Sequence, residues 1–210
     1  MSNSQRRLKR TITLLGSTSV GKSTLCSRFV YNRASTDYEP TIRNQFQHKI
    51  TLNSVEYDLQ IQDTAGLERY PTISEGYINS DGFILVYSTT DNQSFQIIQD
   101  IFISLSNELN KTIPLVLVGN KSDLIEKRKV SSADGEALAK EWGAAFFETS
   151  ALDGKNVTDS FIALLNLIDP IQKMGQSGNG VKKMDKSSGA HIHSQGLTTG
   201  PSAKSSCVVS

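Results

Sequence analysis

Residues 16–24 read GSTSVGKST and fit the pattern G-x-x-x-x-G-K-[ST]. They follow a short apolar run and precede a segment with helical character, which is the context that a phosphate-binding loop requires. Glycines let the backbone wrap a phosphate chain with its N–H groups pointing inward, and the next helix adds partial positive charge from its N-terminus. The pattern predicts that Lys22 reaches the β- and γ-phosphates and that the Ser23 hydroxyl ligates Mg²⁺. The other expected nucleotide contacts in this loop are Ser19, Val20, Gly21 and Thr24.

The composition is that of a globular domain. The chain has 210 residues, enough for one core of about 150 residues with appendages. It is 37% hydrophobic and 20% charged with a net charge of +1, which argues against a nucleic-acid partner. No stretch approaches the roughly 18 apolar residues of a spanning helix, and the N-terminus has no signal-peptide hydrophobic region. We therefore expect the protein to remain in the cytosol.

Strands and helices alternate along the middle of the sequence. Two alternating runs, 46–52 and 55–61, flank Asn53-Ser54 and predict an antiparallel hairpin. The continuously apolar runs 83–88 and 115–120 predict parallel strands that are covered on both faces. The other expected elements are strands 11–15 and 145–149 and helices 23–30, 95–109, 131–142 and 157–168. This order predicts a three-layer α/β domain with a mostly parallel sheet.

Three regions are expected from composition. Residues 1–10 are predicted to be a flexible basic arm, and residues 11–169 to be the folded domain. Residues 170–210 are rich in Gly, Ser and Lys and have few large apolar side chains, so they cannot bury enough surface to offset the entropy of ordering. We predict that they form a flexible tail.

The segment Asn120-Lys-Ser-Asp123 follows the second buried strand and selects the base. The Asp123 carboxylate can accept hydrogen bonds from N1–H and the 2-amino group of guanine, and adenine has neither donor. Lys121 is expected to lay its aliphatic stem along the base, and Asn120 to tie the strand end to the phosphate loop. Ser150-Ala151, after the last strand, is expected to offer a backbone N–H to the guanine oxygen. The pattern therefore predicts GTP and GDP as ligands and argues against an ATPase or a nucleotide kinase.

Two further loops are expected to sense the terminal phosphate. In D63-T-A-G66, Asp63 would hold Mg²⁺ through water and the Gly66 N–H would meet the γ-phosphate. In YEPTI, Thr41 would supply a hydroxyl to the same ion, and Tyr38 would also contact the nucleotide. Both loops would be fastened by the γ-phosphate and released when it leaves, which makes a switch. Lys22, Thr41 and Gly66 are the expected catalytic residues.

Together these motifs resemble a known family. GSTSVGKS, YEPTI, DTAG, NKSD and ETSA, in this order and spacing, resemble the Ras superfamily of small GTPases over residues 11–168. SVGKS, EPTI followed by residues 43–46, YDLQ, GFILVYS and EALAKEWGAAFFETSA further resemble the Rheb branch. The resemblance implies a P-loop GTPase fold, the G domain, with a six-stranded, mostly parallel sheet flanked by five helices. It also implies a magnesium-dependent GTP/GDP cycle with an exchange factor, a GTPase-activating protein, effectors and signalling through a TOR kinase complex.

The chain departs from the family pattern at several positions. Leu67 replaces the glutamine that orients the attacking water, so we expect slow hydrolysis unless other groups position that water. The alternative is a hydrolysis-deficient pseudo-GTPase that acts as a constitutively GTP-bound interaction module. Ala34 and Leu152 lack side chains that commonly cover the base in relatives, so we expect faster nucleotide exchange. Slow hydrolysis and faster exchange together predict a resting state biased toward GTP when cellular GTP exceeds GDP.

The two cysteines have different expected roles. Cys26 falls in an apolar helix pattern and is predicted to be a buried thiol. Cys207-Val-Val-Ser210 fits the C-a-a-X lipidation motif, and its final serine favours farnesyl. The motif implies a prenyltransferase as partner. Because a single prenyl chain binds membranes marginally, we expect reversible attachment to the cytoplasmic face of the plasma membrane or an internal membrane.

Overall fold

The computed structural model describes residues 6–34, 43–64, 79–109 and 113–170. The chain divides into two compact units, residues 1–172 and 173–210, and the fold below is that of the first unit. The predicted tail falls almost wholly outside the described residues, so its flexibility stays a prediction. Among the described residues, no helix combines the length and the apolar character needed to cross a membrane.

A six-stranded sheet runs through the described part of the first unit, in the order β2-β3-β1-β4-β5-β6. Strand β2 pairs antiparallel with β3, and the other neighbours pair parallel. The strands are β1 (Arg7–Leu15), β2 (Arg43–Leu52), β3 (Val55–Thr64), β4 (Gly82–Ser88), β5 (Leu115–Asn120) and β6 (Ala145–Glu148). The expectation of a mostly parallel sheet is therefore confirmed.

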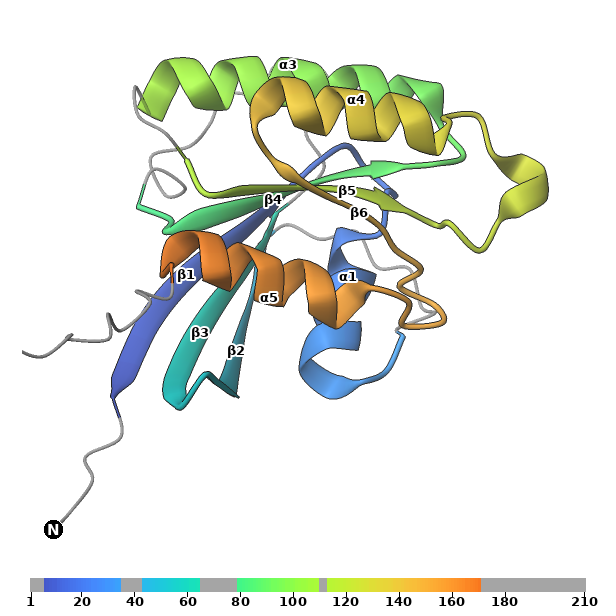
Figure 1. Cartoon of the computed structure of the whole chain (residues 1–210). Coiled ribbons are helices and arrows are strands. Elements are labelled where there is room, and N and C mark those ends of the chain that lie inside the picture. The colour runs from blue at the N-terminus through green and yellow to red at the C-terminus, as the bar shows by residue number, and fades with distance from the viewer. Residues whose placement is uncertain (1–5, 35–42, 65–78, 110–112, 171–210) are drawn as a thin grey trace, which may run out of the picture. The chain divides into compact units, whose positions relative to one another are not determined.

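Helices cover both faces of this sheet and complete three layers (Figure 1). Helices α3 and α4 lie on one face, and α1 and α5 lie on the other. Their bounds are α1 (Lys22–Tyr31), α3 (Asn92–Leu109), α4 (Ser132–Trp142) and α5 (Val157–Ile168), with a short 3₁₀ helix η1 (Ile125–Lys127). The described residues thus hold four of the five implied α-helices, and residues 65–78, among others, lie outside the description.

Two hydrophobic clusters form the core, one on each face of the sheet. In the first, Phe29 of α1 stacks on Phe161 of α5 with ring centroids 4.0 Å apart. In the second, α3 and α4 meet where Phe102 stacks on Trp142 at 4.1 Å. Cover on both faces explains why every residue of β4 and β5 is buried, as their apolar runs predict. Cys26 is fully buried in the first cluster, which confirms the expected buried thiol.

The predicted hairpin joins β2 to β3. Leu52 pairs with Val55, and the two residues between them have φ values of 51° for Asn53 and 65° for Ser54. Positive φ at both central positions is what a two-residue type I′ turn requires. The local sequence therefore places this turn correctly.

The expectation that residues 1–10 form a flexible arm is wrong for residues 7–10, because β1 begins at Arg7. These residues pair parallel with the start of β3, and Leu8 packs against the first core cluster. Arg7 forms ion pairs with two acidic side chains of β3. Arg10 donates from Nε to the Asp169 carboxylate at 2.8 Å. Acidic partners elsewhere in the fold thus compensate a basic run that looks solvated in the sequence.

Candidate functional site

Three loops meet at the carboxyl edge of the sheet, the place where open α/β sheets bind ligands. They follow β1, β5 and β6, and hydrogen bonds join all three. The structure describes most of the predicted site in and beside these loops: Ser19, Val20, Gly21, Lys22, Ser23, Thr24, Asp63, Asn120, Lys121, Asp123, Ser150 and Ala151. The predicted site residues Tyr38, Thr41 and Gly66, with Leu67, lie outside the described residues, as does Cys207.

Two glycines give the phosphate loop its path. Gly16 has φ +155°, and a Cβ atom there would lie 2.2 Å from the Val86 carbonyl oxygen. Gly21, just before α1, has φ +102°, and its Cβ would lie 2.3 Å from Nδ2 of Asn120. Any larger residue would collide with backbone at the first position and with a buried side chain at the second. The loop therefore packs directly against β4 and against the loop after β5.

Lys22 bends back onto the loop that precedes it. Its ammonium donates to the carbonyl oxygen of Gly16 at 3.0 Å and to that of Ser17 at 2.9 Å. The side chain is only 5% exposed, so a positive charge is held inside the loop by the loop's own backbone. A buried cation beside amide N–H groups of a helix N-terminus suits a polyphosphate anion.

Asp63 lies near the end of β3 and is fully buried. Neither of its carboxylate oxygens accepts a hydrogen bond of normal geometry. Burial raises the pKa of this carboxyl, and the nearby Ser23 hydroxyl and Lys22 ammonium lower it to a smaller extent. A buried carboxylate with unmet hydrogen-bonding capacity is costly on its own, and the water shell of a metal ion would satisfy it.

The donor set around Asp63 fits Mg²⁺. This ion keeps several waters and is held by one or two carboxylates together with substrate phosphates. Within the described ranges no group of three or more His, Cys, Asp or Glu side chains forms a metal cluster. Asp63 and Ser23 are the described residues that could hold the ion, and the predicted third contributor, Thr41, is not described.

Asn120 joins the three loops through one buried carboxamide. Its Nδ2 donates to the Val20 carbonyl oxygen at 2.8 Å. Its Oδ1 accepts from the Thr149 hydroxyl at 3.0 Å and from the Ala151 N–H at 3.1 Å. The predicted tie between the end of β5 and the phosphate loop is thus present, and the same side chain also fixes the loop after β6.

The N–H groups expected to face the base are engaged within the protein. The Ala151 N–H donates to Oδ1 of Asn120, and the Ser150 N–H donates to the Lys155 carbonyl oxygen at 3.2 Å. A guanine oxygen bound at either N–H would have to share or replace one of these bonds. This differs from the simple expectation, which did not anticipate a protein acceptor.

The backbone at Lys121 turns sharply. Lys121 has φ +65°, an uncommon value for a residue with a side chain, and its carbonyl oxygen accepts from the Thr89 hydroxyl at 3.1 Å. The N–H of Ser122 donates to the Thr149 carbonyl oxygen at 3.0 Å. Asp123 follows this turn and is half-buried. The turn is therefore held from two neighbouring strand ends, which supports a fixed position for the carboxylate.

Arg28, on the second turn of α1, is a site residue that the sequence patterns miss. Its Nε donates to the Ala151 carbonyl oxygen at 3.0 Å, and its Nη2 donates to the carbonyl oxygen of Leu152. Its Nη1 donates to the Asn32 carbonyl oxygen at 3.1 Å. No motif marks this residue, because its partners in the loop after β6 lie more than a hundred positions away along the chain.

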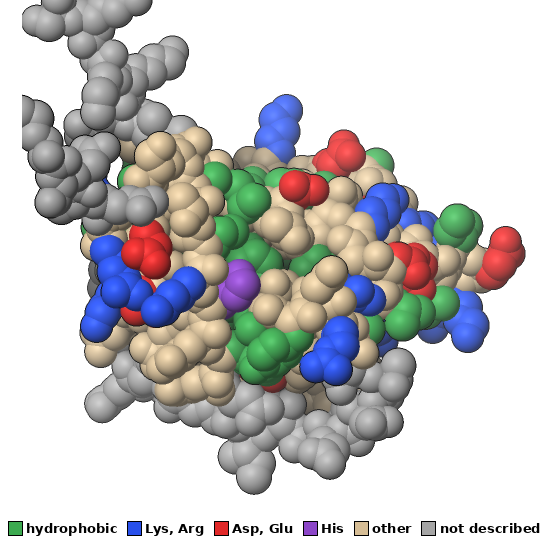
Figure 2. All heavy atoms as spheres, turned by 90° about the horizontal axis from the view of Figure 1, so that it is seen from below, with side chains coloured by type: hydrophobic (Ala, Val, Ile, Leu, Met, Phe, Trp, Pro, Cys, Tyr) green, Lys and Arg blue, Asp and Glu red, His purple; other side chains and the backbone are tan. Residues whose placement is uncertain are grey.

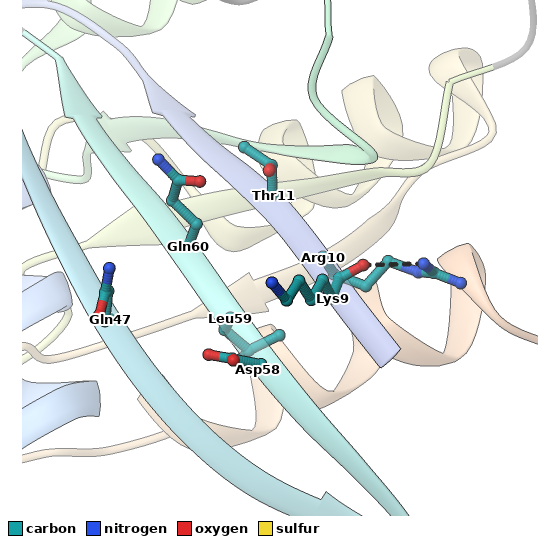
Figure 3. Close-up of a pocket in the computed structure, with 7 residues that line it drawn as sticks. All are labelled: Lys9, Arg10, Thr11, Gln47, Asp58, Leu59 and Gln60. Carbon is teal, nitrogen blue, oxygen red and sulfur yellow. Dashed lines mark hydrogen bonds between the residues drawn. The ribbon is translucent and has the colours of Figure 1, made fainter. Parts of the chain in front are cut away.

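A separate hollow lies on the polar face of β1, β2 and β3 (Figure 3). It has a volume of about 200 Å³ and is lined by Lys9, Arg10, Thr11, Gln47, Asp58, Leu59 and Gln60. Its β1 residues precede the strand end that leads into the phosphate loop. The Arg10 guanidinium turns back to the Lys9 carbonyl oxygen at 2.8 Å. This hollow is therefore distinct from the three-loop site.

The chain matches known proteins over the same region. The model of the Ras family matches residues 11–169. The GTP-binding protein Rheb of Bos taurus is 42% identical over 171 residues, which cover 80% of this chain and 93% of that protein. Rheb of Homo sapiens is 45% identical over 154 residues, or 72% of this chain and 84% of that protein. A Rheb homolog of Dictyostelium discoideum is 39% identical over 175 residues, which cover 79% of this chain and 95% of that protein.

Proposed function

Because the chain belongs to the Ras family, with Rheb among its similar relatives, we propose that it is a magnesium-dependent molecular switch driven by GTP. Family membership supports GTP and GDP as ligands and GTP hydrolysis as the general activity. The observation that carries the proposal is the Asn120 carboxamide, which joins the phosphate loop to both loops expected around the base. One hydrogen-bond network would thus support both the phosphate end and the base end of a bound nucleotide.

The chemistry follows from the described side chains. Lys22 and the amides of the phosphate loop would stabilise the charge that develops on the β- and γ-phosphates as water attacks in line. Ser23 and Asp63 would hold Mg²⁺, which, when bound, supplies further neutralisation of the phosphate oxygens. Asp123 would accept hydrogen bonds from the guanine edge. Thr41 and Gly66 would sense the γ-phosphate from the two loops that lie outside the described residues.

Base selection tests the nucleotide assignment. Nucleotide-free protein titrated with fluorescent GDP and ADP, with and without Mg²⁺, should prefer guanine by about 10⁴-fold or more. Asp123→Asn exchanges an acceptor for a donor, so it should weaken GDP and strengthen the xanthine nucleotide, whose 2-oxo group accepts. Asp100→Asn, an exposed change on α3, is the matched control and should alter neither affinity. Equal binding of ADP and GDP would overturn the proposal.

We propose slow hydrolysis because Leu67 has no polar group to orient water. The same residue favours the second candidate function, a pseudo-GTPase that stays bound to GTP as an interaction module. Single-turnover hydrolysis of wild type and Leu67→Gln, with and without a candidate activating protein, separates the two. A slow wild-type rate that Leu67→Gln raises by about 10-fold or more supports the switch. No hydrolysis in any arm supports the module.

The partners are proposed from the resemblance to Rheb alone. They are an exchange factor, an activating protein and effectors that include a TOR kinase complex. Affinity capture from the native cytosol with the GTP-loaded full chain, compared with the GDP-loaded chain, tests this. Enrichment of a TOR complex by the GTP form supports the proposal, and equal capture by both forms contradicts it.

A further inference from the structure

We propose that Arg28 is a positioning residue that fixes the loop after β6 for contact with the base and thereby slows nucleotide release. The inference rests on the proposed nucleotide-binding function and deepens it. It concerns residues 150–154, the loop expected to meet the 6-oxygen of guanine. Arg28 does not itself touch the nucleotide in this account but acts through the backbone of that loop.

The guanidinium of Arg28 joins α1 to two consecutive peptide units of the loop. It bonds the carbonyl oxygens of Ala151 and Leu152, and a third bond anchors it to Asn32 at the end of its own helix. A planar fork of donors suits several acceptors at once, which a lysine ammonium on a flexible stem does not. Because the donor is charged, these bonds are about twice as strong as neutral ones.

Ala151 is therefore held from both sides. Its N–H is bound by Asn120 and its carbonyl oxygen by Arg28. In a planar trans peptide the next N–H points opposite to the carbonyl, so Arg28 also sets the direction of the Leu152 N–H. The clamp thus determines where the loop presents its donors.

Apolar packing holds the start of this loop, where Ala151 is buried in the first core cluster, but not residues 152–154. Leu152 is 55% exposed, and Gly154 has φ +87°, so the turn is closed mainly by backbone hydrogen bonds such as Gly154 N–H to the Ser150 carbonyl oxygen at 2.8 Å. Because Leu152 is exposed, the charged bonds from Arg28 supplement the packing of Ala151 and are the described side-chain hydrogen bonds between this loop and α1. The same helix begins at Lys22, so the clamp ties the base side of the site to the phosphate side.

The first test measures GDP dissociation from the loaded full chain in Mg²⁺. Arg28→Met keeps an unbranched apolar stem and removes every donor, so release should accelerate about tenfold. Arg28→Lys keeps the charge but cannot span both carbonyls, and it should fall between wild type and Arg28→Met. The control Arg10→Met removes an arginine that bonds the Asp169 carboxylate, away from the three-loop site. It should lower the thermal midpoint and leave the GDP release rate unchanged.

The second test separates positioning from general destabilisation by changing the ligand. Inosine diphosphate keeps the 6-oxygen and lacks the 2-amino group, whereas 6-thio-GDP carries sulfur, a weak acceptor, at position 6. Arg28→Met should accelerate release of GDP and inosine diphosphate by the same factor and release of 6-thio-GDP by much less.

Each outcome has a defined meaning. An unchanged GDP release rate in Arg28→Met would overturn the inference, and so would equal acceleration of all three nucleotides. The inference is supported if the GDP release rate rises from wild type through Arg28→Lys to Arg28→Met and if Arg28→Met accelerates release of 6-thio-GDP much less than release of GDP. A wild-type chain that bound no guanine nucleotide would overturn the proposed function itself, a result distinct from failure of the clamp.

Discussion

A single carboxamide, that of Asn120, carries much of the site's rigidity. Removing it in Asn120→Ala would leave the Val20 carbonyl, the Thr149 hydroxyl and the Ala151 N–H without this partner in a buried region. Unpaired buried groups cost about 1–3 kcal/mol each, and partial relaxation lowers the sum. We predict that the free energy of unfolding falls by about 2–4 kcal/mol and that GDP affinity falls at least about tenfold.

Urea unfolding and GDP titration check this prediction. Asn107→Ala, an exposed change on α3, is the control and should shift the free energy of unfolding by less than about 0.5 kcal/mol. If Asn120→Ala unfolded at the same urea concentration as wild type, the three bonds would carry no net stability.

His48 gives the fold a pH dependence. It lies on β2, half-buried, and its ring meets that of Phe29 edge-on with centroids 4.9 Å apart. On the face drawn in Figure 2, green hydrophobic side chains lie next to the purple of histidine. Burial lowers its pKa below 6.5. The unfolded chain therefore binds a proton more readily than the folded one, and stability present above pH 6.5 is lost as the pH falls through the lowered pKa.

We predict that wild type loses stability relative to His48→Phe as the pH falls from 7.5 to about 5, because the phenyl ring does not titrate. Urea unfolding of both proteins under saturating GDP, at several pH values, measures the difference. A difference in free energy of unfolding that stays constant with pH would show that His48 has the same pKa in both states.

Individual site residues could be predicted from the sequence where they belong to a motif whose residue types imply a function. NKSD follows a buried strand, so the bond from Asn120 to the phosphate loop could be read from the sequence. The glycines that shape the phosphate loop could be predicted from its motif in the same way. Arg28 was not, because only the folded chain brings α1 against the loop after β6. The protein acceptor of the Ala151 N–H was missed for the same reason.

At the scale of elements, the β2–β3 turn offers a stabilising change. Ser54 adopts φ +65°, which costs energy for a residue with a Cβ atom and suits glycine. We predict that Ser54→Gly raises the free energy of unfolding by about 0.5–1 kcal/mol, because relief of strain exceeds the added entropy of the unfolded chain. Thermal unfolding of the GDP-loaded wild type and Ser54→Gly measures this difference in stability.

A matched control comes from a residue in ordinary conformation. Thr51→Gly, two residues before the turn on β2, removes a residue suited to strands and should lower the thermal midpoint. A lower midpoint in Ser54→Gly as well would mean that the serine side chain supports the turn despite its φ value.

Local and distant causes explain which elements were predictable. The hairpin depends on residues 52–55, and the apolar runs of β4 and β5 reflect burial on both faces, so each was visible in its own segment. The first half of β1 was not, because its pairing depends on β3 and its Arg10 depends on Asp169 beyond α5. A run of basic residues alone looks solvated until those partners are known.

At the scale of the whole molecule, the family match ends at residue 169 and the sequence continues for a further segment that ends in CVVS. Composition and motif alone support the proposal that a farnesyl group on this tail attaches the protein to the cytoplasmic face of a membrane. From residue 171 onward it has five lysines and one aspartate, dispersed along the segment. That charge adds only modest attraction to anionic lipid, so attachment should be reversible.

The chain has two cysteines, so a variant at Cys207 tests the proposed farnesyl anchor and a variant at Cys26 serves as its control. After treatment with a farnesyltransferase and farnesyl diphosphate, the GDP-loaded chain should bind neutral phosphatidylcholine vesicles weakly and vesicles with added phosphatidylserine more strongly. Cys207→Ser should abolish both while retaining GDP, because the lipid joins only that thiol. Cys26→Ala should keep vesicle binding, since the Cys26 thiol is fully buried and inaccessible to the transferase. Vesicle sedimentation measures each case, and Cys207→Ser protein that still sediments with vesicles would refute a prenyl anchor at this position.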